Sequence, residues 1–251
     1  MCGWENGGVR CRACDPAARS CAMLPPKSPA IASTGDKRGF MRQRFAFLLA
    51  AALSCLGAGV AEAHPHVWVT MRTTILFDPQ GNFVGLRNDW TFDEAFTAFA
   101  LQGFPKDANG NYAKETLAPL AEVNVTSLKE YDYFAHGKTA KAKMAFKDPV
   151  DYSLTFDKDL LTLHFTLPVA KPVPSKGSLT FELYDPTYFV SFDFEEKDPV
   201  RLEGAPSGCT FSVVTPSQPQ TMQVDESFFT NLTSSSTYGA QYADKILVKC
   251  P

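Results

Sequence analysis

The chain of 251 residues is 45% hydrophobic and carries 24 basic and 27 acidic side chains, for a net charge of −3 at neutral pH. Residues 64–251 taken alone have 16 basic and 23 acidic side chains, and therefore a net charge of −7. An acidic protein with scattered lysines is a poor nucleic-acid binder, so we expect no nucleic-acid partner. The same acidity suits a protein that collects cations, although it is also the common composition of a solvated surface.

A secretory signal peptide is predicted at residues 41–63. It has a short basic start, an apolar stretch at 45–58, and the small residues that signal peptidase requires at Ala61 and Ala63. The apolar stretch is too short for a membrane-spanning helix of about 20 residues, so no stable membrane insertion is expected after cleavage. Cleavage after Ala63 would leave His64 as the first residue of a periplasmic protein.

Residues 1–40 precede this signal and are rich in glycine, proline, serine and arginine. Because a signal peptide normally begins a chain, we interpret 1–40 as a non-native or disordered extension and Met41 as the true start. Of the seven cysteines, only Cys209 and Cys250 remain after cleavage. In an oxidising compartment they most simply form one disulfide, although a pair of metal ligands is the alternative. Residues 64–251 are expected to form a single domain with a substantial core.

In the first half of this domain, the spacing of apolar residues changes once, from a strand pattern to a helical pattern. Residues 66–77 and 83–92 are rich in β-formers and are separated by a proline–glycine turn, which predicts a hairpin. Apolar residues then recur at helical spacing, which predicts a short helix over 93–102 and, after a polar loop, a second helical segment over 113–134. Pro119 is interpreted as marking the first turn of that second helix.

Short strands return in the second half of the domain, separated by Asp-Pro and Lys-Pro turns. We expect a mainly β (α+β) fold: an antiparallel β-sandwich-like body with an inserted EF-hand-like helix–loop–helix at about 93–134. A further helix is expected at 224–232. The predicted strands are 139–146, 152–156, 160–167, 178–183, 188–194, 200–203, 210–214 and 244–250.

The expected mature N-terminus is the main candidate metal site. The α-amine and ring nitrogen of His64 can chelate one ion, and a second histidine completes the three nitrogens of a histidine brace, which suits copper. His66 is two residues away, on the same face of a strand. His136 and His164 are candidate distal partners, although alternation places His164 on the polar, solvent-facing side of its strand. Imidazole also suits zinc, nickel and cobalt, and the alternative is a simple polar arm.

The loop between the two predicted helices has part of an EF-hand pattern. Asp107, Asn109 and Asn111 fall at ligand positions 3, 5 and 7. Pro105 and Thr116 occupy positions 1 and 12, where an Asp and a bidentate Glu are needed. We therefore expect an EF-hand-like shape without tight calcium binding, and the alternative is an ordinary helix–helix connector.

The domain also contains a specific set of short motifs. They are HPHVW at 64–68, WTFDEAF at 90–96, SLKEY at 127–131, LHF at 163–165, YDPTYF at 184–189, LEGAPSGC at 202–209 and VKCP at 248–251. Together they resemble the bacterial periplasmic family named domain of unknown function 1007, often labelled the periplasmic component of an uncharacterised ABC-type transport system. The family tends to occur beside nickel/cobalt-type or zinc-related membrane transporters, so the resemblance implies a role in metal homeostasis.

The expected function is that of a periplasmic accessory protein that binds zinc, nickel, cobalt or copper and serves an inner-membrane metal transporter. One alternative is a copper-dependent oxidative enzyme that uses the histidine brace. Trp68 and Trp90 are candidates for its aromatic face, although their strand positions favour the core for both. The other alternative is a protein-interaction module without metal. We find no nucleophile elbow, phosphate loop, dinucleotide fingerprint or zinc-protease helix motif, so no catalytic residues are assigned.

Overall fold

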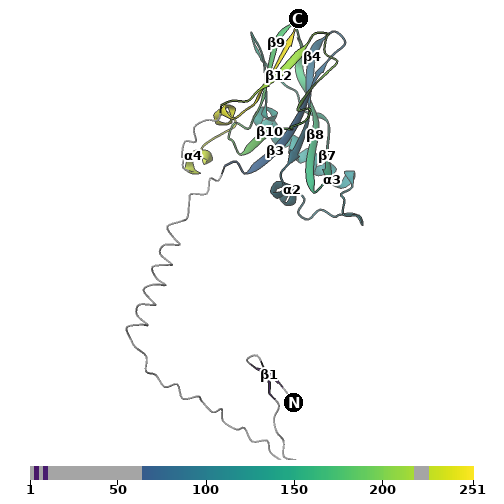
Figure 1. Cartoon of the computed structure of the whole chain (residues 1–251), viewed down its shortest axis with the longest axis vertical. Helices are drawn as coiled ribbons and strands as arrows, with labels where there is room; N and C mark the ends of the chain where they lie inside the picture. The colour runs from purple at the N-terminus through teal and green to yellow at the C-terminus, as the bar shows by residue number, and fades with distance from the viewer. Residues whose placement is uncertain (1–2, 6–7, 11–63, 218–225) are drawn as a thin grey trace, which may run out of the picture. The chain divides into compact units, whose positions relative to one another are not determined.

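The computed structural model describes residues 64–217 and 226–251, together with the backbone of residues 3–5 and 8–10. The chain divides into two compact units, 1–60 and 61–251. In the first unit, β1 (Gly3–Glu5) and β2 (Gly8–Arg10) form an antiparallel pair (Figure 1). The rest of the predicted extension and the whole predicted signal peptide lie outside the described residues.

The second unit is mainly β, and its larger sheet has six strands in the order β10-β3-β4-β8-β7, with β11 also paired to β3. Of these, β3 and β4 form the predicted hairpin. Its turn is closed by the backbone N–H of Asn82, which donates to Asp78 Oδ1 at 2.8 Å. The strands are β3 (Val67–Phe77), β4 (Asn82–Phe92), β7 (Val150–Asp157), β8 (Leu160–Pro174), β10 (Val190–Phe194) and β11 (Val200–Glu203).

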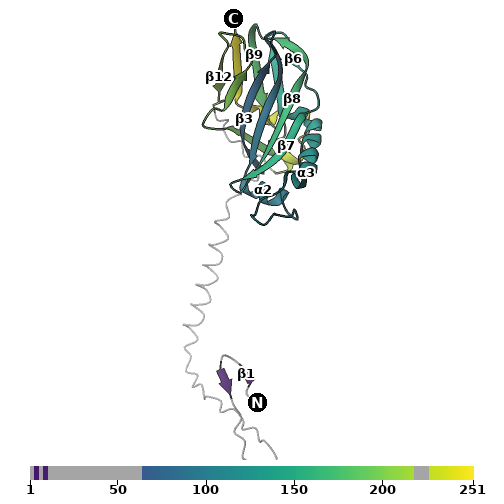
Figure 2. The ribbon, with the colours of Figure 1, turned by 90° about the vertical axis from the view of Figure 1, so that its right-hand side faces the viewer.

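The smaller sheet has five strands in the order β12-β13-β9-β5-β6, and every pairing in it is antiparallel. Figure 2 shows strands of both sheets running along the long direction of this unit. The strands are β5 (Ala135–Thr139), β6 (Lys143–Met144), β9 (Gly177–Leu183), β12 (Thr210–Val214) and β13 (Lys245–Cys250).

The fully antiparallel body that the sequence predicts is therefore only partly observed, because the larger sheet is mixed. Both β10 and β11 pair in parallel with β3. In the chain, β10 and β11 follow β9, which belongs to the other sheet. They pair with the edge of β3 that β4 does not occupy, and they run in the same direction as β3. Alternation of apolar residues reports which face of a strand is buried, and it carries no information about the direction of the neighbouring strand.

Both sheets contribute to one hydrophobic core. In β3 the buried residues alternate, so that Val69 and Met71 point inward while Trp68 on the other face is 49% exposed. Each fully buried large apolar side chain contributes about 1.5–3 kcal/mol to folding. Phe83 from the larger sheet packs against Phe181 from the smaller one, with ring centroids 4.8 Å apart. The expectation that Trp68 lies in the core is wrong, and the same expectation for Trp90, 2% exposed, is confirmed.

The prediction of one strand over 139–146 is wrong. The structure instead has a hairpin between β5 and β6, with its turn near Thr139. The hydroxyl of Thr139 accepts from the backbone N–H groups of Lys141 and Ala142 at 3.1 and 3.0 Å, which satisfies the polar backbone of the turn. A side-chain hydroxyl can thus end a strand at a residue whose propensity favours continuing it.

The predicted helical insertion lies between β4 and β5 and contains two α-helices. The short α2 (Glu94–Ala100) begins after Asp93, whose Oδ1 accepts from Phe96 N at 2.8 Å as an N-cap. The longer α3 (Lys114–Ser127) contacts β7, and Figure 2 shows it beside that strand. Pro119 lies inside α3, so the interpretation of Pro119 as a first-turn residue is wrong. Leu117 N donates to Ala113 O at 3.2 Å, and the helix has therefore formed one turn earlier.

The predicted helical segment 113–134 does not continue as an α-helix to its end. Its last part is the 3-10 segment η1 (Leu128–Phe134), in which Asp132 and Tyr133 have φ values of 50° and 57°. These left-handed conformations turn the chain into β5. Near the C-terminus, the predicted helix 224–232 is observed as α4 (Glu226–Thr230), and η2 (Tyr238–Gln241) follows it. No helix in the described part of the chain has the length and apolarity needed to cross a membrane.

The predicted disulfide links Cys209, just before β12, to Cys250 at the end of β13, 41 residues further along the chain. We expect the double variant C209A/C250A to have a free energy of unfolding lower by about 4 kcal/mol, because the crosslink restricts the unfolded chain. Urea denaturation of the two proteins measures this difference. Equal stabilities would show that the bond contributes little beyond the pairing of β12 with β13.

Candidate metal site

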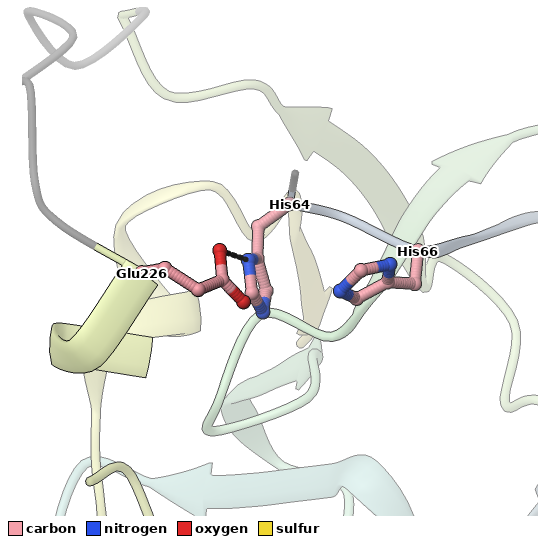
Figure 3. Close-up of side chains that lie close together, drawn as sticks. All are labelled: His64, His66 and Glu226. Atoms are coloured by element: carbon pink, nitrogen blue, oxygen red, sulfur yellow. Dashed lines mark ion pairs between the residues drawn. The ribbon is translucent and has the colours of Figure 1, made fainter. Parts of the chain in front are cut away.

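Three side chains that can ligate a metal meet at the start of β3. His64, His66 and Glu226 each offer one ligand atom, and these atoms all lie within 4.8 Å of one another. Figure 3 shows the Glu226 carboxylate beside the His64 ring and the His66 ring on the other side of His64. His64 Nδ1 is 3.6 Å from Glu226 Oε2, and the two imidazole centroids are 4.5 Å apart. The group thus joins the beginning of the described domain to α4.

The imidazole of His64 is held by an aromatic neighbour. Its ring stacks on Phe229 of α4, with centroids 3.8 Å apart and an interplanar angle of 7°. Its side chain is only 7% exposed, and its buried Nδ1 has no hydrogen-bond partner among the described residues. Burial lowers the pKa of His64, although the nearby Glu226 carboxylate opposes this shift. His64 is therefore neutral at pH 7, which is the form that binds a metal.

The position of His66 is set by the backbone of Phe189. The N–H groups of His66 and Val67 both donate to the Phe189 carbonyl oxygen, at 2.9 and 3.2 Å. The His66 ring also lies 4.8 Å from the Phe189 ring, centroid to centroid. The parallel pairing of β10 with β3 continues from this point, with Val190 opposite Val67. One of the two strands that make the sheet mixed, β10, therefore also anchors the candidate metal site.

Asp185 organises the loop that carries Phe189. This carboxylate is 3% exposed and accepts four hydrogen bonds at 2.8–3.1 Å, from the backbone and hydroxyl of Thr187 and from the backbone N–H groups of Phe189 and Val190. A carboxylate so engaged inside a turn fixes the loop as an Asx turn. The YDPTYF motif of the sequence is thus explained as a structural support for the site.

The same loop receives the C-terminal segment that contains Glu226. Gly239 packs so closely that any side chain there would overlap the carbonyl oxygen of Asp185. Tyr188 stacks on Tyr242 with centroids 4.0 Å apart, and Tyr238 packs against Phe229 at 5.5 Å. These contacts attach α4 and η2 to the loop, and so place Glu226 beside the histidines.

The sequence analysis missed Glu226. Carboxylates are frequent in this acidic chain, and Glu226 is separated from His66 by 160 residues, so no spacing pattern marks it. It lies inside a predicted helix, where a glutamate is most simply a solvent-exposed residue. Only the packing of α4 on the YDPTYF loop identifies it as a neighbour of His64.

The three candidate ligands fit a first-row transition metal. Imidazole nitrogen and carboxylate oxygen lie about 2.0–2.2 Å from Zn²⁺, so that ligand atoms of one tetrahedral site are about 3–4 Å apart. The observed separations approach this range, and the exposed side chains of His66 and Glu226 can rotate to close the remaining gap. Two imidazoles and one carboxylate suit zinc, cobalt, nickel or copper, and leave at least one coordination position open.

The other two histidines lie elsewhere. His164 on β8 uses both ring nitrogens, because Nδ1 is 2.6 Å from Asp89 Oδ1 and Nε2 is 2.8 Å from Thr155 Oγ1. Its half-buried side chain alternates with the buried Leu163 and Phe165, so it lies on the outer face of the larger sheet, as its alternation predicts. His136 on β5 stacks on Tyr184 at 4.1 Å and lines a separate polar cavity. The structure brings neither of them into the His64 group.

The His164–Asp89 pair makes a prediction for acid stability. The hydrogen bond from His164 is the main cause of the lowered pKa of Asp89. Because the folded pKa lies below the unfolded one, the unfolded chain takes up the proton first. The stabilisation is therefore complete above the ordinary value of about 3.8 and is lost as the pH falls below it. Thermal melts between pH 2.5 and 6 should show a shallower acid decline for Asp89→Asn than for the wild type, and parallel curves would contradict this assignment.

The predicted EF-hand-like loop connects α2 to α3, and its carboxylate is engaged with the backbone. Asp107 Oδ1 accepts from Asn109 N and Asn111 N, both at 2.8 Å, and Gly110 takes a φ of 83° to close the turn. Asp107 N also donates to Asn111 O at 2.7 Å. The loop is thus a hydrogen-bonded Asx turn, and its one carboxylate, Asp107, lies outside the group formed by His64, His66 and Glu226.

Fold and site together define a mainly β protein whose two sheets share one core and in which two histidines at the start of β3 meet a carboxylate of α4. The family described as protein of unknown function (DUF1007) matches residues 49–250, and the chain belongs to this family. An uncharacterised protein of Haemophilus influenzae is 24% identical over 191 residues, which cover 75% of this chain and 91% of that protein. An uncharacterised 15.5 kDa protein of Spirochaeta aurantia is 26% identical over 102 residues, or 41% of this chain and 73% of that protein.

Proposed function

We propose that this protein is an exported, periplasmic metal-binding accessory protein that holds a transition-metal ion through His64, His66 and Glu226. The observation that carries the proposal is the convergence of these three side chains from two distant parts of the chain. A neutral, largely buried His64 ring next to two more exposed ligands provides a site that can both bind and release an ion. An inner-membrane metal transporter is the partner that we propose for this exchange.

Signal-peptide cleavage after Ala63 would add a fourth ligand to the site. The α-amine of His64 would then lie on the same residue as the imidazole, and the two can chelate one ion together. Export would thus create the complete site only in the compartment where the ion is exchanged. Four nitrogen and oxygen ligands of this kind suit zinc, nickel, cobalt and copper, and copper would be favoured by the three-nitrogen brace.

The test is intact mass and metal content of the protein purified from the periplasm of a bacterial host, followed by titration with Zn²⁺, Ni²⁺, Co²⁺ and Cu²⁺. We expect a mass that begins at His64 and close to one bound ion per chain. A protein of that mass that takes up none of the four ions would overturn the metal-binding proposal. Peroxide production by the copper-loaded protein with a reductant would instead assign it to oxidative copper chemistry.

A further inference from the structure

The polar cavity that His136 lines is separate from the candidate metal site. Its volume is about 350 Å³, and it is lined by η1, β5, β6 and the end of β9. Sites for small ligands commonly have volumes of about 300–1,000 Å³, so this cavity is large enough for a small organic molecule. None of the three candidate metal ligands belongs to its lining.

The register of the strands places the charged part of this lining on one face of the smaller sheet. His136 on β5 lies opposite Glu182 on β9. Lys138, also on β5, lies opposite Lys143 on β6. Opposite residues of antiparallel strands share a face, and so do residues two apart along one strand, so these side chains lie on the same side. The ring of Tyr184 stacks on His136, with centroids 4.1 Å apart, and forms an aromatic wall.

Most of the polar lining is either engaged with the protein or uncharged. Glu182 Oε1 is 3.5 Å from Lys138 Nζ and 3.3 Å from Lys245 Nζ, so two lysines balance this one carboxylate. Burial lowers the pKa of His136, so its ring is neutral at pH 7, and its buried Nε2 offers no contact to a ligand. Burial raises the pKa of Tyr184, so its hydroxyl stays protonated and adds no charge.

Asp132 and Lys143 are the charged groups of the lining that have no such partner. Both side chains are exposed, and neither forms an ion pair within the described part of the chain. Besides burial, the Asp132 carboxylate and the Lys143 ammonium group both shift the pKa of His136, in opposite directions, so both charges lie near this ring. Tyr133 donates its hydroxyl to Asp148, which is not part of the lining. The cavity therefore offers one carboxylate and one ammonium group beside a neutral aromatic wall.

We infer that this cavity binds a free α-amino acid with an apolar side chain, whose carboxylate pairs with Lys143 and whose ammonium group pairs with Asp132. A ligand with only one of these charges would displace water from the second group without replacing its hydrogen bonds. Met144 and Phe146 belong to the lining and supply half-buried apolar surface for the side chain of the ligand. This binding site is independent of the proposed metal site.

The experiment compares L-leucine with two molecules that each lack one of its charges. 4-Methylpentanoate keeps the carboxylate without the ammonium group, and 3-methylbutylamine keeps the ammonium group without the carboxylate. Each is titrated at pH 7 into metal-free wild-type protein, and the affinity is measured by isothermal titration calorimetry. The same titrations are made with three variants whose folding is checked by thermal melts.

Each variant removes one charge from an exposed position. Lys143→Met keeps the length of the side chain without its ammonium group. Asp132→Asn removes the carboxylate at a residue with a φ of 50°, a conformation that asparagine tolerates. Lys147→Met is the matched control, because this exposed lysine is near Lys143 in the sequence and does not line the cavity.

We expect L-leucine to bind at least about tenfold more tightly than either analogue, because each analogue loses one hydrogen-bonded charge pair. Lys143→Met should remove the preference for L-leucine over 3-methylbutylamine, and Asp132→Asn should remove the preference over 4-methylpentanoate. Lys147→Met should keep both preferences. Absence of L-leucine binding, equal affinities in the wild type, or a preference that persists in its matching variant would overturn the inference. Because metal is absent throughout, no result depends on whether the histidines at the start of β3 bind an ion.

Discussion

Replacement of His64 by alanine is expected to lower the affinity for a transition-metal ion by at least about 100-fold. The variant loses the imidazole that lies between Glu226 and His66 and that burial keeps neutral. Loss of groups that merely orient a metal ligand already costs about 10–100-fold, so the loss of a ligand itself should cost more. Isothermal titration of the exported wild type and variant with Zn²⁺ and Cu²⁺ measures the change.

The controls separate ligation from packing. His64→Phe retains an aromatic ring that can stack on Phe229, so it should fold like the wild type while binding metal as weakly as His64→Ala. Glu226→Gln keeps the shape of the third ligand and removes its charge, and should also weaken binding. His164→Ala removes a histidine on the outer sheet face and should leave metal affinity unchanged. Unchanged affinity in His64→Phe would remove the start of β3 from consideration as a metal site.

The sequence predicted those elements whose burial pattern is simple. The hairpin expected at 66–77 and 83–92 appears as β3 and β4 with boundaries within one residue, because each strand buries one face and exposes the other. The disulfide followed from there being only two cysteines in the domain. One of the Asp-Pro turns expected between the strands is observed at Asp185, since an Asp before proline favours turns.

The elements that escaped prediction depend on contacts between distant segments. The parallel pairing of β10 with β3 follows from the path of the chain through the other sheet. Glu226 became a candidate ligand only because Gly239 allows the C-terminal segment to pack against the Asp185 loop. The histidines at 64 and 66 could be selected from sequence because they lie two residues apart at the expected mature N-terminus. Their third partner could not be selected, because a lone carboxylate carries no positional signal.

Asp185→Ala is expected to lower the free energy of unfolding by about 3–5 kcal/mol. The buried carboxylate accepts four hydrogen bonds, and its removal takes away the acceptor of the part-buried backbone N–H groups of Phe189 and Val190. Hydrogen bonds to charged groups contribute about 1.5–3 kcal/mol each, and their contributions within one network are not additive. Urea denaturation of the disulfide-intact proteins at pH 7 measures the loss. The conservative Thr187→Val, which removes one hydroxyl donor, should cost no more than about 1 kcal/mol.

Asp185→Asn tests whether this loop also positions the metal ligands. Asparagine can keep one acceptor oxygen for Thr187, but it places an amide NH₂ opposite the N–H groups of Phe189 and Val190. Repulsion there should release the Phe189 carbonyl, which accepts from the backbone of His66. We expect a folded protein with metal affinity lowered about 10–100-fold, the effect typical of a group that orients a ligand. A folded Asp185→Asn protein with wild-type affinity would show that His66 is placed by β3 alone, and that the YDPTYF loop supports the fold without supporting the site.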